Sequence, residues 1–150
     1  MDKPNKQELI QVSRKLGLEI EVLDDDLSKD YIKRVIKKFK PYKTAGHLAI
    51  GVNSRNIALE KYEFSYSKYL NSEPAFIFFD QEGLDRNTVV IVKDAQLVGD
   101  LMENSFGMEY FLSNEKMDYL IAVNWYVIEV SDSAVSLFSN LDIRQEDYND

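Results

Sequence analysis

His47 is the single histidine of the chain, and histidine is the side chain that most often performs acid–base catalysis. A catalytic histidine needs a nucleophile and a carboxylate that orients its ring, and no such motif surrounds His47 in residues 44–48. Gly46 and Gly51 have the spacing of a phosphate-binding loop, but the Lys-Ser or Lys-Thr pair that must follow is missing. We therefore expect His47 to be structural or merely exposed.

Carboxylates are the second kind of side chain that could do chemistry. With 26 acidic residues, neighbouring carboxylates arise by chance, so little weight falls on pairs drawn from Glu60, Glu63, Asp80 and Glu82. The triplet at residues 24–26 lacks the Asp-x-Asp-x-Asp-Gly spacing of a calcium loop, and the absence of cysteine excludes thiolate metal sites and catalytic thiols. We expect no catalytic residue, no metal and no cofactor. An enzyme that uses carboxylates alone is the least favoured alternative.

Charge is spread unevenly over the 150 residues. Residues 29–43 contain seven basic side chains and one aspartate, a charge of +6, and because the whole chain carries −8 the remaining residues carry −14. This acidic remainder disfavours direct binding to nucleic acids and membranes and favours association with a basic protein partner. The basic segment is either a solvated helix face or a contact for nucleic acid or an acidic partner.

Acidic and aromatic residues of the second half are the best candidates for contacting a basic partner. A connection between two buried strands must run over the surface, and residues three apart on a helix share a face. Tyrosine and tryptophan combine a rigid apolar area with a polar tip, as interface anchors do. The predicted partner-binding residues are Asp80, Glu82 and Asp85 in a strand connection, Asp100 and Glu103 on the following helix, and Trp125 and Tyr126 as aromatic anchors.

Two helices are predicted in the N-terminal part. Apolar residues recur on one stripe over residues 6–15, and Gly17 follows where a helix-terminating glycine belongs. Ser28 is expected to cap a second helix that ends at Phe39. The apolar face of this second helix comprises Tyr31, Ile32, Val35, Ile36 and Phe39. The segment 44–74 is left open, apart from a helix expected around residues 56–61.

The second half is predicted to form a sheet. Residues 75–79 and 88–92 are continuous apolar runs, typical of strands covered on both faces, and the short link between them favours antiparallel pairing. Further strands are expected at 108–112 and within 119–130, where Asn124 either forms a turn or lies inside one strand. Helices are expected after Asp94 and after Ser133. The chain is predicted to be a single α+β domain over residues 1–150, with an antiparallel sheet in the C-terminal half and the N-terminal helices packed mainly on one side.

Three stretches of the second half resemble small bacterial immunity proteins, the cognate inhibitors of secreted or contact-delivered toxins. They are Phe78-Phe79-Asp80, the strand from Val89 to Val92, and Phe106-Gly107-Met108-Glu109-Tyr110-Phe111, and the resemblance covers residues 75–130. It implies an acidic α+β protein of the cytoplasm that binds a toxin domain and occludes its active site. No apolar stretch approaches the ~20 residues needed to span a bilayer, which also favours the cytoplasm. The alternative is a small intracellular protein-interaction or regulatory domain unrelated to toxins.

Overall fold

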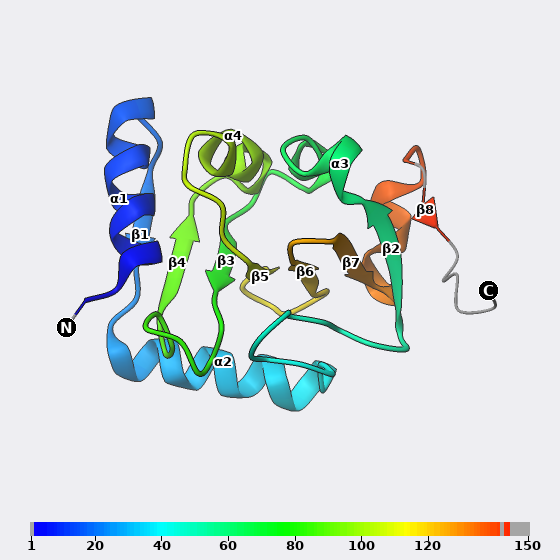
Figure 1. Cartoon of the computed structure of the whole chain (residues 1–150), viewed down its shortest axis with the longest axis horizontal. Helices are drawn as coiled ribbons and strands as arrows, with labels where there is room; N and C mark the ends of the chain where they lie inside the picture. Colours follow the sequence, from blue (N-terminus) through cyan, green and yellow to red (C-terminus); the bar gives the residue numbers. More distant parts are fainter. Residues whose placement is uncertain (1, 142, 145–150) are drawn as a thin grey trace.

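The computed structural model describes residues 2–141 and 143–144, and within these residues eight strands form one sheet. The strands pair antiparallel in the order β1-β4-β3-β5-β6-β7-β2-β8 (Figure 1). They are β1 (Ile20–Val22), β2 (Ser54–Ala58), β3 (Ala75–Phe78), β4 (Val89–Val92), β5 (Tyr110–Ser113), β6 (Ile121–Val123), β7 (Val127–Ser131) and β8 (Ile143–Arg144). The helices are α1 (Pro4–Leu16), α2 (Asp25–Phe39), α3 (Leu59–Tyr62) and α4 (Val98–Glu103), with 3-10 turns η1 (Tyr66–Tyr69), η2 (Ala95–Leu97) and η3 (Asp132–Phe138). The predicted α+β class is confirmed, and the sheet also takes in β1 and β2 from the N-terminal half.

Alternate side chains of the central strands enter two different cores, one on each face of the sheet. Ile77 of β3 packs in the core that includes Leu9 of α1, whereas Phe76 and Phe78 pack in the core that includes Val35 of α2. Figure 1 shows α3 and α4 along one side of the molecule and α2 along the other. Helices α1, α3 and α4 therefore share one face of the sheet and α2 covers the other, so the prediction that the N-terminal helices pack mainly on one side does not hold for α1 and α2. The reason is that strands with apolar residues at every position need a cover on both sides.

Helix α2 begins at a different cap from the predicted one. The side chain of Asp24 accepts the backbone N–H of Leu27 at 2.8 Å, so the helix starts before Ser28. The hydroxyl of Ser28 instead accepts the backbone N–H of Val89 at 3.1 Å and ties α2 to β4. On the predicted apolar face, Tyr31, Ile32 and Val35 are buried and Ile36 and Phe39 are partly buried.

The predicted helix around residues 56–61 is wrong in its first half. Residues 54–58 form β2, where Ile57 pairs with Ile128 of β7 and is completely buried. Only the residues that follow turn into the short helix α3. The pairing partner lies in the last part of the chain, so long-range packing decides the conformation of a segment whose local pattern was ambiguous.

Candidate partner-binding site

The turn between β6 and β7, held by hydrogen bonds of the Asn124 side chain, leaves two aromatic side chains exposed. The side-chain oxygen of Asn124 accepts the backbone N–H groups of Tyr126 at 2.8 Å and Val127 at 3.0 Å, which closes the link between β6 and β7. Its amide also donates to the carbonyl of Leu48 at 2.9 Å. Asn124 is therefore the turn that the sequence left as one of two possibilities. The turn leaves Trp125 52% exposed and Tyr126 71% exposed.

A small hairpin, in which Lys43 pairs with Ala49, lies beside this turn, and two carboxylates hold its tip. Asp80 accepts the backbone N–H of Gly46 at 2.9 Å. Glu109 accepts the backbone N–H of Leu48 at 2.9 Å, and its other oxygen lies 2.8 Å from Nδ1 of His47. Gly46 has a φ of 75°, a left-handed conformation that glycine adopts without strain. Three consecutive tip residues are thus fixed by acidic groups that lie just before β5 and shortly after β3.

These elements enclose a shallow cavity of about 380 Å³, which we call the aromatic–acidic pocket. Trp125 forms one wall, and a methyl group added at Gly107 would lie 2.9 Å from its Cζ3 atom, so the indole ring rests directly on the glycine. Tyr126 meets the ring of His47 edge-on at 5.0 Å and extends the aromatic surface beyond the pocket. The pocket is lined by Asn5, Gly46, His47, Asp80, Gly107, Met108, Glu109 and Trp125.

Comparison of the chain with protein-family models, curated proteins and solved structures finds no match.

The pocket combines a half-exposed indole, two carboxylates and an imidazole, which together suit recognition of a positively charged group. In the part of the chain that the structure describes, no cluster of three or more His, Asp or Glu side chains is arranged to hold a metal ion. No helix among these residues is long and apolar enough to span a bilayer.

The structure brings only some of the predicted partner-binding residues together. Asp80 and Trp125 line the aromatic–acidic pocket, Tyr126 flanks it through His47, and Glu82 is exposed in the same strand connection as Asp80. Asp100 and Glu103 are both exposed on α4, as predicted, but they line a different depression together with residues 59–61, 63–65 and Lys68.

Asp85 is the one predicted contact that the structure contradicts. Its side chain is buried, with 4% of the residue exposed, and its two oxygens accept the backbone N–H groups of Asn5 and Lys6 at 3.0 Å each. A loop between buried strands does run over the surface here, as expected. The start of α1 covers this part of the loop, because the unpaired N–H groups of a helix N-terminus attract a carboxylate.

Two ionisable residues of the pocket lining, His47 and Glu109, were missed by sequence reasoning. Glu109 and His47 stand 62 positions apart, and only the folded chain places them in contact. A signal for Glu109 did exist, since it is a charged residue inside the apolar run at residues 108–112. A carboxylate in such a run needs a polar partner, because burial of an unpaired charge is costly. For His47 nothing in the local sequence indicated the partner.

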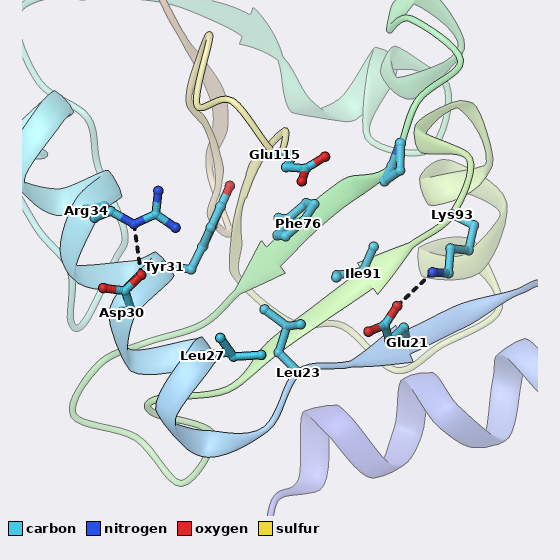
Figure 2. A pocket seen from close by; sticks show the side chains of 11 residues that line it. Glu21, Leu23, Leu27, Asp30, Tyr31, Arg34, Phe76, Ile91, Lys93 and Glu115 are labelled. Carbon is cyan, nitrogen blue, oxygen red and sulfur yellow. Dashed lines mark hydrogen bonds and ion pairs between the residues drawn. The ribbon is translucent and has the colours of Figure 1, made fainter.

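A second hollow, of about 370 Å³, lies beside α2, on the face of the sheet whose core includes Val35. We call this hollow the α2 groove. Figure 2 shows an apolar centre with an ion pair at each end. The pairs are Arg34 with Asp30 at 3.0 Å and Lys93 with Glu21 at 2.7 Å. The groove is lined by Glu21, Leu23, Leu27, Asp30, Tyr31, Arg34, Pro74, Phe76, Ile91, Lys93 and Glu115.

The floor of the α2 groove is rigid and apolar. The ring of Tyr31 stacks on Phe76 with centroids 4.7 Å apart, and the Tyr31 hydroxyl donates to the carbonyl of Asn114 at 2.7 Å. Burial raises the pKa of Tyr31 far above its ordinary value, so this hydroxyl stays protonated and holds its hydrogen bond at neutral pH. Because both cations of the groove are already paired, its surface favours an apolar ligand over a charged one.

Proposed function

We propose that the protein is a non-enzymatic inhibitor of the immunity type. In this proposal it acts in the cytoplasm, binds a basic toxin domain through the aromatic–acidic pocket and its rim, and occludes the active site of that domain. A toxin domain that cleaves nucleic acid must present basic residues to bind phosphates. An acidic surface on the inhibitor competes for the same basic residues.

One observation carries the proposal: Asp80, Trp125 and Tyr126, which come from different parts of the chain, converge on a single surface. Large aromatic side chains that remain half or more exposed lose favourable burial in the free protein and recover it in a complex. Tryptophan and tyrosine are also the residues that most often dominate binding energy at protein interfaces. Carboxylates beside such anchors select a basic partner and speed its approach.

The decisive experiment is co-expression with the product of the neighbouring gene. The proposal expects that product to arrest growth when it is expressed alone and to be harmless beside this protein. It also expects the two purified proteins to form a complex in which the toxin activity is lost. A harmless neighbouring product, or toxicity that this protein does not relieve, would overturn the proposal.

A matched pair of tyrosines tests where the toxin binds. Tyr126→Ala removes a side chain at the rim of the pocket, and Tyr42→Ala removes an equally exposed one, 77% exposed, near Val52. We expect Tyr126→Ala to weaken binding by about tenfold or more, as truncation of an anchor residue does. Tyr42→Ala is expected to bind as the unmodified protein does. The reverse result would place the interface at residues 42–52.

The α2 groove favours the second candidate function, a protein-interaction domain without any toxin. Its apolar floor suits an apolar segment of a partner, and Leu27, exposed at its edge, is available for contact. Under this alternative Leu27→Asp abolishes partner binding and Trp125→Ala does not. Under the toxin proposal the effects of these two substitutions are exchanged.

A further inference from the structure

Two carboxylates line the aromatic–acidic pocket, and one of them contacts the imidazole of His47. Asp80 accepts the backbone N–H groups of Gly46 and Glu82, and Glu109 accepts that of Leu48 while it contacts His47. An ionised carboxylate has about four acceptor positions, so each of these groups keeps room for further donors. No lysine or arginine is among the residues that line this pocket in the described chain.

The two carboxylates line the same cavity and hold neighbouring residues of the hairpin tip. Asp80 binds Gly46, and Glu109 contacts His47, the next residue along the chain. Adjacent Cα atoms are only about 3.8 Å apart, so both acidic groups meet the same short stretch of backbone. A ligand that enters the cavity therefore meets both carboxylates in its lining.

Trp125 supplies the third part of the recognition surface. It lines the same cavity as the two carboxylates, it is half exposed, and Gly107 beneath it leaves no side chain that would displace the ring. Tryptophan is the aromatic side chain that attracts cations most strongly. A flat cationic group can thus lie on the indole while it donates to the carboxylates.

We propose that this pocket receives an arginine side chain of the basic protein partner. This inference rests on the proposed function, which supplies the basic partner. The guanidinium group is planar, stacks on aromatic faces and carries five donors in a fixed fork that matches carboxylates. A lysine ammonium is a compact, strongly hydrated charge that does not stack in this way. The cavity volume of about 380 Å³ is large enough for a side chain of this size.

The inference can be tested on the protein alone, because Trp125 is the only tryptophan of the chain. Nα-acetyl-arginine amide is titrated while the indole N–H signal of Trp125 is followed by NMR. Nα-acetyl-citrulline amide, which has nearly the same shape but no charge, and Nα-acetyl-lysine amide serve as comparison probes. We expect a saturable shift with the arginine probe and binding of the citrulline probe that is weaker by about tenfold or more.

Three variants locate the binding. Asp80→Asn keeps an oxygen that can accept from Gly46 but removes the charge, and we expect it to weaken the arginine probe by about tenfold. Gly107→Ala displaces the indole ring and is expected to weaken the probe without any change in charge. Glu19→Gln removes one charge at an exposed residue outside the pocket, and we expect it to bind as the unmodified protein does. Circular dichroism checks that each variant is folded, and the two pocket variants provide independent readings if one fails to fold.

Three results would overturn the arginine pocket: no saturable shift, equal binding of the citrulline and arginine probes, or equal binding of the lysine and arginine probes. A failure of this kind is separate from a failure of the proposed function, because protection against the toxin is measured by growth and the probe titration contains no toxin. A protective protein whose pocket ignores arginine would keep the proposed function and lose the pocket assignment.

Discussion

Asp85 accepts the backbone N–H of Asn5 at 3.0 Å, across 80 positions of sequence. A second oxygen of the same carboxylate accepts the N–H of Lys6, so the first turn of α1 receives its cap from the connection between β3 and β4. The local capping position, Lys3, has no side-chain hydrogen bond to the helix. Asp85 therefore joins the N-terminal helix to the sheet, and its role is structural.

This cap predicts the effect of removing the carboxylate. Asp85→Ala leaves the N–H groups of Asn5 and Lys6 without their acceptor, and we expect the free energy of unfolding to fall by about 1–2 kcal/mol. Urea denaturation measures this loss. Glu82→Ala, at an exposed position in the same connection, is expected to change stability by less than about 0.5 kcal/mol. Equal stability of the two variants would show that the cap is dispensable.

Gly99 predicts a second stability effect. A methyl group added there would lie 2.2 Å from the carbonyl oxygen of Phe64 and 2.8 Å from its carbonyl carbon, which are backbone atoms that cannot rotate away. Gly99→Ala is therefore expected to destabilise the fold by about 1–3 kcal/mol, although alanine is ordinarily the better helix former. At Gly83 the nearest atom is 3.5 Å away, so Gly83→Ala is the control and should be tolerated. A stabilised Gly99→Ala variant in thermal or urea unfolding would contradict the close packing of α4 on the segment around Phe64.

Glu129 predicts a dependence of stability on pH. Burial raises the pKa of its carboxyl above the ordinary 4.5, while N–H groups of Ile50 and Gly51 partly oppose the shift. Because the folded state binds the proton more tightly than the unfolded state, the stability that Glu129 contributes is greatest below pH 4.5 and falls as the pH rises through the raised pKa. Glu129→Gln lacks this proton, so the stability of the unmodified protein relative to the variant should decline over that range. Urea denaturation of both proteins at a series of pH values gives the comparison, and parallel profiles would refute it.

Association kinetics distinguish the two acidic surfaces. Asp80→Asn with Glu82→Gln removes two charges beside the aromatic–acidic pocket, and Asp100→Asn with Glu103→Gln removes two charges on α4. We expect the first pair to slow association with the proposed basic partner by about 3–10-fold at low salt and much less at high salt, since exposed charges act mainly by steering. The second pair should have little effect. Stopped-flow measurements at several salt concentrations decide between them, and a larger effect of the α4 pair would move the interface to that helix.

The predictable parts of the fold are those whose signal is local. The apolar period of α2 and the continuous apolar runs of β3 and β4 are each contained in a few residues, and all three elements were found. The strand at residues 54–58 was missed because its conformation depends on pairing with β7, and no residue near this segment indicates that pairing. The cap at Asp24 was missed because Ser28 is an equally good capping residue in type and lies only four positions away.

The candidate site follows the same division. Trp125 and Tyr126 were selected by residue type, and their exposure depends on the turn at Asn124, which the sequence left as one of two possibilities. The assembly of the pocket could not be predicted, since His47, Asp80 and Glu109 meet only through tertiary structure. Asp85 is an acidic residue in a surface loop, as a partner contact requires. Its carboxylate, however, accepts backbone N–H groups at the start of α1, which is distant in the sequence.

The order of strands in the sheet has a consequence for synthesis on the ribosome. Ile20 of β1 pairs with Val92, and Ser54 of β2 pairs with Ser131. The two strands that are synthesised first therefore cannot pair until β4 and β7 have been synthesised. They also stand far apart in the sheet, with β4, β3, β5, β6 and β7 between them. Pairing over such long sequence separations is slow, because the chain loses the entropy of closing a large loop before the strand contacts form. The growing chain therefore cannot pair β1 and β2 as they appear, whereas β3 with β4 and β6 with β7 are consecutive strands that can pair before the rest of the sheet is complete.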